Sequence, residues 1–459
     1  MKIPVKKVAA SSKKFAIRCK PDYSPVEKTY RKNQIIVTYD HFPTAADEEK
    51  VRSYFHDMGF DNIAVKKCSN CNMPVQLWQA AHIETVIVAK GVTAGSGPGT
   101  KTVGESYSLN FLNTIPHQDF EAPVTFPSSA KSSLSPADEI RIAVLDTGID
   151  TALVEGQYIA GSLPNAEGFG CFNQTAAGWN FIEENANYQD DSPGRHGSLV
   201  AQFIINEFKR YPGKRLQLIP VKTHDESGRG DLFTILCAIY YAIAKGANII
   251  NASWGFYFYE KQPLPQLQAV MQMLKKRGIL FITAAGNQDA KDDKVATGVF
   301  LANTGVAPTP KQLRNLALHP FLPACMSRKG NNVLTVTTTD GERVAATANF
   351  SNRFVDMGVR SLIDRNGDLW FRVPFAQDGD PGLVRGSSFA TAIATGVIGA
   401  RCSNALFTPG KVSKTLFIND LAQRNLQGRG NPVCEHLEAL DTSLIREGVC
   451  VNSDAGTLA

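Results

Sequence analysis

Gly386-Ser-Ser-Phe-Ala-Thr-Ala392 is a polar turn that leads into a run of small and apolar residues reaching about Ala400. As a helix, this run is apolar on nearly every face, so it should be buried in a large core. The start of a helix favours negative charge, because its N–H groups and its dipole point there. A hydroxyl at Ser387 or Ser388 is therefore either a nucleophile that passes through an oxyanion or a simple helix cap. Taken alone, the motif favours capping.

From Glu139 onward, apolar strands alternate with helices. This pattern is typical of an α/β fold whose parallel sheet is covered by helices on both faces. The active site of such a sheet lies outside the carboxyl ends of its strands. The predicted strands are 140–145, 216–222, 248–254, 279–285 and 332–338, and the predicted helices are 198–210, 231–245 and 264–277.

Three polar residues stand at that edge of the predicted sheet. Asp146 ends the first strand, His196 begins a helix, and Asn287 follows the strand 279–285. Each has a simpler interpretation, namely an acceptor for loop N–H groups, a capping imidazole and a turn-forming amide. Together with Ser388 they supply what hydrolysis by an activated serine needs: a nucleophile, a base, an orienting carboxylate and an oxyanion donor. The chain order Asp, His, Ser differs from the orders of chymotrypsin and of the α/β-hydrolases.

Four stretches resemble the signature motifs of subtilisin-like serine proteases, and the similarity runs from about residue 139 to about residue 447. The resemblance implies that Asp146 orients the base and that His196 acts first as general base and then as general acid. It also implies that Ser388 is the nucleophile and that Asn287 donates to the oxyanion beside the Ser388 backbone N–H. The four stretches are Val144-Leu-Asp-Thr-Gly148, His196-Gly-Ser-Leu-Val-Ala201, Ala284-Ala-Gly-Asn287 and Gly386-Ser-Ser-Phe-Ala-Thr391.

The resemblance further implies a three-layer, subtilisin-like fold and hydrolysis of peptide bonds through an acyl-enzyme, without a metal or an organic cofactor. Two positions depart from the family pattern. Ser198 stands where Thr is usual, which is chemically conservative. Ala392 stands where Pro is usual, and Pro is tolerated in a first helical turn but not required there.

Two more stretches resemble the strands between which the family binds an extended peptide by strand addition, Gly228-Arg229-Gly230 and Ser253-Trp254-Gly255. Small residues at Ser253, Gly255, Ala285 and Gly286 would leave room for a side chain in the primary pocket. Turn geometry explains these glycines equally well. Trp254 is interpreted as a pocket wall, with simple core packing as the alternative.

The N-terminal part predicts a small α+β unit over 31–92, with a strand at 34–39, a helix at 44–59 and further strands at 63–67, 75–78 and 83–89. This unit lies where the family carries a propeptide, although the second helix of that domain is not evident. The resemblance implies an intramolecular inhibitor. The Gly-, Ser- and Thr-rich segment Lys90 to Gly104 is the expected cleavage site.

The remaining boundaries follow from composition: a polar leader over 1–30, a linker and irregular lead-in over 93–137, a catalytic domain over 138–447 and a C-terminal tail over 448–459. The segment 288–325 is predicted to form surface loops. The acidic stretch 183–191 lacks a calcium-ligand spacing and is predicted to be a solvated loop.

The composition is that of a globular protein, with 459 residues, 43% hydrophobic and 20% charged. A net charge of +5 with dispersed basic residues does not indicate a nucleic-acid partner, and no apolar stretch is long enough to span a membrane. Without a recognisable secretory signal, we expect a cytoplasmic protein whose nine cysteines are thiols. Cys68 and Cys71 form half of a zinc-type spacing, for which a plain turn is the favoured interpretation.

Protein or peptide substrates and the chain's own N-terminal unit are thus the expected partners. A protein with a silent catalytic site that only binds a partner in its cleft is the main alternative. An esterase or lipase of the α/β-hydrolase type is disfavoured by the order of the triad and by the Gly-x-Ser-x-Ala sequence.

Overall fold

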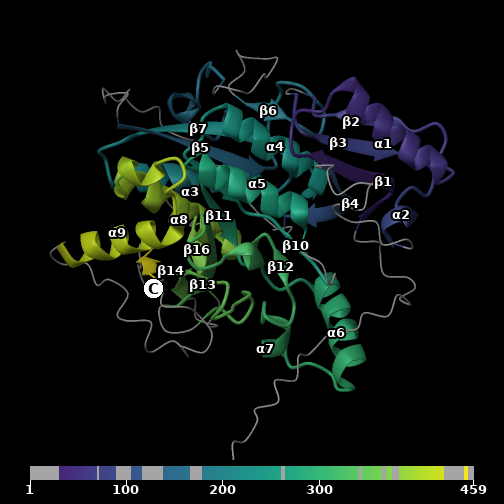
Figure 1. Ribbon diagram of the computed structural model, residues 1–459. Coiled ribbons are helices and arrows are strands. Elements are labelled where there is room, and N and C mark those ends of the chain that lie inside the picture. Colours follow the sequence, from purple (N-terminus) through teal and green to yellow (C-terminus); the bar gives the residue numbers. More distant parts are fainter. Residues whose placement is uncertain are drawn as a thin grey trace, which may run out of the picture.

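The computed structural model contains two units that pack against each other, a small N-terminal one and a large one built on a parallel sheet (Figure 1). The residues that the structure describes are 30–69, 72–88, 105–115, 138–165, 178–259, 264–340, 344–363, 369–374, 382–427 and 449–452. The leader expected over 1–30 therefore lies outside them except for Tyr30.

The large unit is organised around an eight-stranded sheet in which every neighbouring pair of strands is parallel. The order across the sheet is β18-β14-β13-β11-β9-β5-β7-β6, which confirms the predicted α/β class. The strands are β5 (Glu139–Asp146), β6 (Trp179–Asn180), β7 (Arg215–Lys222), β9 (Ile249–Ala252), β11 (Leu280–Ala284), β13 (Val333–Thr339), β14 (Met357–Arg360) and β18 (Val449–Asn452).

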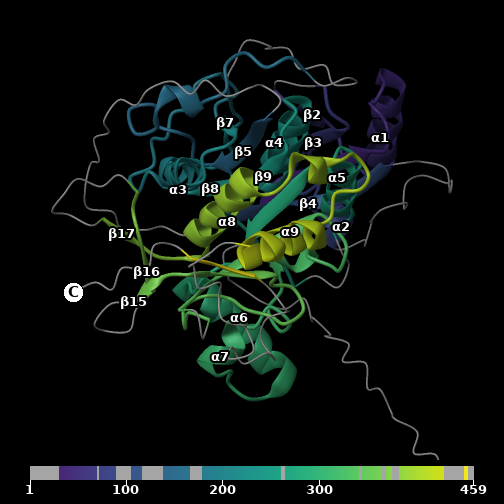
Figure 2. The same ribbon diagram turned by 90° about the vertical axis from the view of Figure 1, so that its left-hand side faces the viewer.

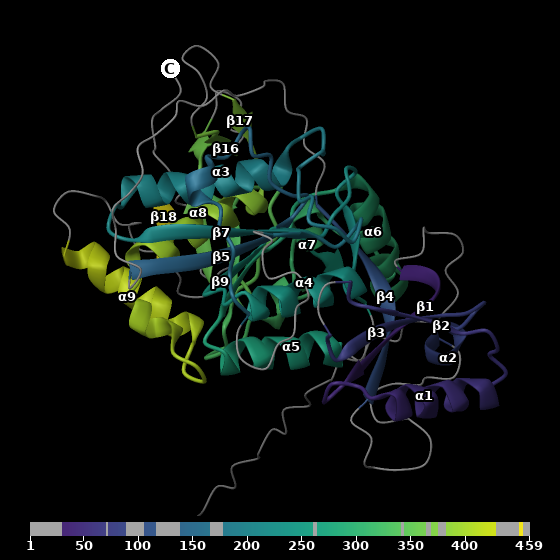
Figure 3. The same ribbon diagram turned by 90° about the horizontal axis from the view of Figure 1, so that it is seen from above.

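Helices cover both faces of this sheet, as Figure 3 shows from above. Alternate residues of β5 point to opposite faces, because successive side chains of a strand do. Ile142 and Val144 pack with the helices of one face, and Ala143 and Leu145 with those of the other. The first face carries α3 (His196–Arg210), α8 (Ser387–Arg401) and α9 (Lys414–Gln427), and the second carries α4 (Leu232–Ala244) and α5 (Pro265–Lys276).

Strand β5 lies at the point where the strand order reverses. Its neighbours β7 and β9 lie on its two sides and follow it in the chain. The crevice outside the carboxyl ends of strands at such a switch point is the usual ligand site of an open α/β sheet. Asp146, the last residue of β5, lies at that edge.

The N-terminal unit is a sheet with one long helix on its outer face (Figures 1 and 3). Val51 and Phe55 of the helix pack against Trp78 and Tyr107 of the sheet. The elements are β1 (Tyr30–Tyr39), α1 (Ala45–Asp57), β2 (Ala64–Lys67), β3 (Val75–Gln79), α2 (Thr85–Val88) and β4 (Glu105–Thr114).

Four expectations about these elements are wrong. The segment 83–89 was expected as a strand, but Thr85–Val88 is a short helix. The lead-in expected to be irregular contains β4, whose residues pair with β1. The tail expected over 448–459 contains β18, which pairs with β14 at the edge of the main sheet. Tyr107, Leu109 and Phe111 alternate with polar residues, so β4 carries a strand period that the prediction missed; neither β4 nor β18 indicates in its own sequence which distant strand it pairs with.

The fourth concerns the segment 288–325, which was expected as surface loops. It contains two helices, α6 (Ala290–Thr304) and α7 (Pro310–Leu313), and the short strand β12 (Phe321–Leu322). Asp289 caps α6 by accepting hydrogen bonds from the backbone of Lys291 and Asp292. Both helices lie away from the main sheet (Figure 2).

Short strands complete the structure. Three of them, β15 (Leu362–Ile363), β16 (Leu369–Arg372) and β17 (Leu383–Val384), form a small antiparallel sheet just before α8. Strand β10 (Phe256–Tyr257) pairs with β12. Strand β8 (Arg229–Asp231) pairs with β4 and so joins the sheet of the N-terminal unit to the large unit.

Candidate active site

Asp146 and His196 form a buried pair at the switch point of the sheet. The Nδ1 atom of His196 lies 2.8 Å from Oδ1 of Asp146, and both side chains are almost wholly buried. The same carboxylate oxygen accepts a hydrogen bond from the backbone N–H of Thr147 at 2.8 Å. A carboxylate held in this way fixes the imidazole ring and leaves Nε2 to act on a substrate.

The position of His196 depends on the glycine that follows it. A Cβ atom at Gly197 would lie 2.2 Å from the backbone oxygen of Gly148 and 3.0 Å from Cβ of Asp146. Only glycine therefore allows the first turn of α3 to approach the end of β5. Asp190 secures the same turn, because its Oδ2 accepts hydrogen bonds from the backbone N–H and the hydroxyl of Ser198.

Ser388 lies in the first turn of α8, which packs against α3 and against the sheet, and it is 1% exposed. Its hydroxyl donates to the backbone oxygen of Ser253 at 3.1 Å, and the Ser253 hydroxyl donates to the backbone oxygen of Ser388. Nε2 of His196 has no hydrogen-bond partner among the residues that the structure describes. Forming the full triad therefore requires the Ser388 hydroxyl to turn from Ser253 to His196.

Ser387 and Ser388 do not cap α8, which corrects the simpler interpretation of the motif. No side-chain capping bond is present at its N-cap, Gly386. The Ser387 hydroxyl instead accepts a hydrogen bond from the backbone N–H of Gly286 at 3.1 Å. Sequence reasoning missed this role, because the contact joins residues about a hundred positions apart.

Asn287 lies beside the start of α8, as expected of an oxyanion donor. Its Oδ1 accepts a hydrogen bond from the backbone N–H of Ser387 at 2.8 Å. This bond fixes the amide plane and leaves Nδ2 as the group that can donate to an oxyanion. The structure thus brings Asp146, His196, Ser388 and Asn287 to one edge of the sheet.

The two stretches predicted to bind a peptide face each other, and a strand of the chain itself lies between them. Asn113 and Thr114 of β4 pair with Gly230 and Arg229. On the opposite side, the backbone N–H of Thr114 donates to the oxygen of Gly255 at 3.3 Å. The following residue, Ile115, donates to the oxygen of Gly228 at 2.7 Å.

The small residues of the expected primary pocket do leave space, and an aromatic ring fills it. A Cβ atom at Gly255 would lie 2.2 Å from the Phe321 ring, and one at Gly286 would lie 3.1 Å from it. Ala285 is fully buried beside them. Phe321 belongs to β12, in the segment expected to be surface loops, so the sequence offered no sign of this contact. Trp254 is 1% exposed and lies next to the ring of His224.

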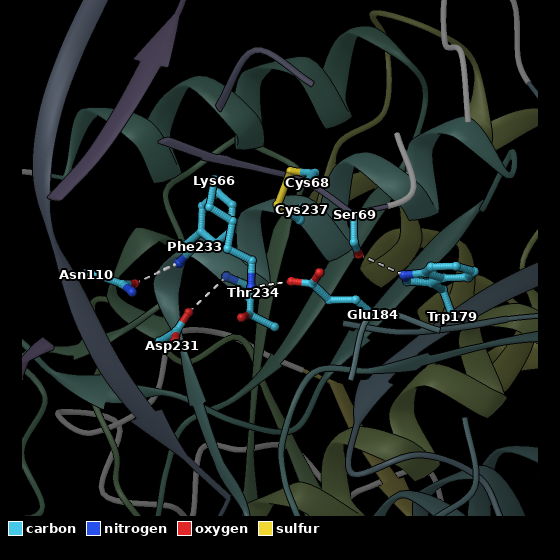
Figure 4. The surroundings of a disulfide bond; sticks show 10 residues. All are labelled: Lys66, Cys68, Ser69, Asn110, Trp179, Glu184, Asp231, Phe233, Thr234 and Cys237. Carbon is cyan, nitrogen blue, oxygen red and sulfur yellow. Dashed lines mark hydrogen bonds and ion pairs between the residues drawn. A yellow bond between two sulfur atoms is a disulfide. The ribbon is translucent and has the colours of Figure 1, made fainter. Parts of the chain in front are cut away.

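The prediction that all nine cysteines are thiols is wrong. Cys68, just after β2, forms a disulfide with Cys237 of α4 and so joins the two units covalently (Figure 4). Cys325 and Cys402 are buried thiols. Cys71 lies outside the described residues, which leaves the half zinc spacing untested. The cytoplasmic location, which rested partly on thiols, stays a prediction.

No group of three or more His, Cys, Asp or Glu side chains is arranged to hold a metal ion within the described part of the chain. In the loop 183–191, Asp191 contacts the buried amine of Lys222, and Asp190 supports α3. None of the helices in the described ranges is both long and apolar enough to cross a bilayer.

Together, the fold and the site define an α/β protein that carries an Asp-His pair, a serine and an asparagine at the carboxyl ends of a parallel sheet. The model of the subtilase family matches residues 137–430, and this chain belongs to that family.

Individual relatives match over shorter stretches. The Major intracellular serine protease of Bacillus subtilis (strain 168) is 29% identical over 164 residues, which are 34% of this chain and 45% of that protein. The Thermophilic serine proteinase of Bacillus sp. (strain AK1) is 25% identical over 247 residues, 52% of this chain and 51% of that protein. The chain thus spans about half of the length of these curated relatives. A solved cold adapted subtilisin-like serine proteinase aligns with 69% of this chain and 89% of its own, at 17% identity and a TM-score of 0.43.

Proposed function

We propose that this chain is a serine endopeptidase that hydrolyses peptide bonds through an acyl-enzyme on Ser388. The observation that carries the proposal is the buried Asp146–His196 pair, 2.8 Å apart, with its free Nε2 at the same edge as Ser388 and Asn287. No interaction in the described part of the chain occupies this nitrogen, so it is available as a base. Membership of the subtilase family supports the same reaction.

In this mechanism, Nε2 of His196 takes the proton of the Ser388 hydroxyl while Oγ attacks the peptide carbonyl. The negative charge that develops on the carbonyl oxygen is stabilised by Nδ2 of Asn287 and by the backbone N–H of Ser388. His196 then gives the proton to the departing amine. A water molecule, activated by the same imidazole, hydrolyses the ester and restores the hydroxyl.

We further propose that the N-terminal unit inhibits the enzyme, because β4 lies between the two peptide-binding stretches. An extended substrate would need the same backbone groups of Gly228 and Gly255 that now bond with Ile115 and Thr114. Cleavage within 90–104, as first expected, would leave β4 attached to the catalytic unit. We therefore move the expected cleavage to the segment 116–137, which lies outside the described residues.

The catalytic proposal is tested on the full chain with the recognition sequence of a site-specific protease inserted between residues 120 and 130. Cleavage there and reduction of the disulfide give a species that we call the released enzyme. We expect the released enzyme to hydrolyse peptides. We also expect labelling of Ser388 by a fluorophosphonate, measured by intact mass. The Ser388→Ala variant should show neither. If the released enzyme shows neither, the chain is the silent binding protein that is the second candidate.

One contact bears on that second candidate: the Ser388 hydroxyl bonds to the Ser253 backbone oxygen instead of His196. In a protease this bond must break before each turnover. Catalytic hydrogen bonds are often unformed in the absence of substrate, so the contact is compatible with both candidates.

The inhibitory role is tested by Thr114→Pro in the otherwise intact chain. Proline lacks the N–H that Thr114 donates to Gly255, so β4 should bind the groove less tightly. We expect peptide hydrolysis by the uncleaved chain to rise several-fold. Thr114→Val keeps the N–H and serves as the matched control. Equal rates for both variants and the parent chain would contradict inhibition by β4.

A further inference from the structure

A second histidine, His224, lies at the floor of the groove that β4 occupies. It follows the end of β7 by two residues and is fully buried. Its Nδ1 lies 2.9 Å from the hydroxyl oxygen of Thr223. Its Nε2 lies 2.5 Å from Oδ1 of Asn113, which is 1% exposed. The triad mechanism gives this histidine no role.

The contact between Asn113 and His224 depends on Gly230, which pairs with Asn113 across the groove. A Cβ atom at Gly230 would lie 2.8 Å from Oδ1 of Asn113 and 3.0 Å from Cδ2 of His224. Trp254 closes the other side, with its ring centroid 6.1 Å from that of His224. The groove therefore contains a small compartment in which the imidazole faces one side chain of the bound strand, while Nδ2 of Asn113 and Nε1 of Trp254 are buried without a hydrogen-bond partner among the described residues.

The chemistry of the compartment suits an amide. Burial lowers the pKa of His224 to about 4, so near neutral pH the ring is uncharged and offers one N–H. The Thr223 hydroxyl also donates to the backbone oxygen of Asp146, so either ring nitrogen can carry the N–H. An amide suits both forms, because it can accept from Nε2–H or donate to a bare Nε2. An aliphatic side chain would leave Nε2 buried without a partner, which is unfavourable. A substrate carboxylate at this place would be buried close to the negative charge of Asp146, which already acts on His224. Burying a second negative charge there is unfavourable.

The strand register gives the position of this amide relative to the reacting bond. In the antiparallel pairing, Thr114 stands opposite Gly255. In a substrate bound in the same register, the second residue after the one in the place of Thr114 would stand opposite Ser253, whose backbone oxygen is 3.1 Å from Oγ of Ser388. A substrate bound like β4 would present to Ser388 the carbonyl of that residue. The side chain in the place of Asn113 then belongs to the fourth residue before the scissile bond.

We propose that His224 is a specificity-determining residue that selects an amide side chain, asparagine before glutamine, at the fourth residue before the scissile bond. The proposal rests on the peptidase function proposed above and on β4 as a mimic of the bound substrate. It assigns to His224 a contact with substrate and no part in the bond-breaking step.

The test uses the released enzyme and three fluorogenic peptides that differ only at this position, with Asn, Asp or Leu. We expect kcat/KM for the Asn peptide to exceed that for the Leu peptide by about 5- to 100-fold, the usual effect of one unpaired buried polar group. The Asp peptide should also be cleaved more slowly than the Asn peptide. In His224→Leu the ratio of Asn to Leu should fall to about one or below, while the Leu peptide is still cleaved.

One further variant tests the binding role directly. His224→Gln keeps a side-chain donor, so it should restore part of the preference for Asn; a restored preference would separate a binding role from a general effect on folding. If the parent enzyme cleaves the three peptides at equal rates, the assignment of His224 is overturned, whereas the peptidase proposal stands. Absence of both hydrolysis and Ser388 labelling would overturn the peptidase proposal and this inference with it.

Discussion

At the scale of single residues, the site is built from side chains that each bind two neighbours. Asn287 is the clearest case, because its oxygen accepts a hydrogen bond from the backbone N–H of Ser387 and its Nδ2 is the proposed donor to an oxyanion. Ser387 in turn holds the N–H of Gly286. The polar residues at the start of α8 therefore position the loop after β11 and include the proposed nucleophile.

The oxyanion role of Asn287 predicts the behaviour of Asn287→Asp in the released enzyme. Aspartate keeps an oxygen that can accept from Ser387 but removes the donor, so kcat should fall by at least about 10²-fold with little change in KM. Steady-state kinetics on one peptide measures both constants. The control is the urea midpoint of unfolding, which should match that of the parent; a loss of kcat below tenfold would exclude Asn287 as an important donor.

At the scale of secondary-structure elements, α3 and α8 carry the proposed base and the proposed nucleophile and pack closely against each other. A Cβ atom at Gly396 of α8 would lie 2.8 Å from Cβ of Glu207 of α3. Glu207 is 2% exposed, and burial raises its pKa to about 7 in spite of the nearby Arg210. The helix contact thus contains an acid that is easily accommodated only when it holds its proton.

This arrangement predicts a pH-dependent stability. Between about pH 4.5 and 7 the folded chain keeps the proton of Glu207 while the unfolded chain releases it, so the free energy of unfolding falls as pH rises through this window. Glu207→Gln removes that fall. In a Ser388→Ala background, we expect the Gln variant to be more stable than its parent by about 1–3 kcal/mol at pH 8 and by much less at pH 4.5.

Urea unfolding at the two pH values measures this difference. Glu226 is exposed, so Glu226→Gln is a matched control that should change stability little at either pH. An equal effect of Glu207→Gln at pH 4.5 and pH 8 would show that its titration does not contribute.

At the scale of the whole molecule, the two units are held together by apolar packing, by β4 and by a covalent bond. Phe111 of β4 stacks on Phe256 with ring centroids 5.7 Å apart. Around the disulfide of Cys68 and Cys237, an ion pair between Lys66 and Glu184 and a hydrogen bond from Trp179 to Ser69 cross the same boundary (Figure 4).

The disulfide predicts that cleavage of the connecting segment is not enough to free the enzyme. A covalent tether keeps the N-terminal unit at a high effective concentration near the groove. After cleavage at the inserted sequence, the two fragments should migrate together without reductant, and peptide hydrolysis should stay low. Reduction should separate them and raise the rate.

Cys68→Ser tests this role of the disulfide directly. The cleaved variant should separate and become active without reductant, as followed by size-exclusion chromatography and peptide hydrolysis. Ser69→Ala, which leaves the disulfide intact, is the control. Full activity of the cleaved parent under oxidising conditions would contradict the tether.

The sequence alone was enough to predict the α/β class and to select the four residues of the proposed catalytic cluster, which the structure brings to one edge of the sheet. The reason is local, because a short stretch of sequence is enough to recognise each element. One kind is a buried strand with a polar residue at its end, and the other is a helix that begins at His196 or at the Ser388 motif. The edge at which parallel strands end then brings these residues together. The family motifs add roles to the same positions.

Only the tertiary structure decided what fills the site. The pairing of β4 with β8, the Phe321 ring beside Gly255 and Gly286, the bond between Cys68 and Cys237, and the contact of Asn113 with His224 all join residues more than 30 positions apart. Such contacts arise from the packing of whole elements against one another, and hydrophobic periodicity carries no information about the partner. The residues of the proposed chemistry could therefore be predicted locally, whereas the groove and its occupant could not.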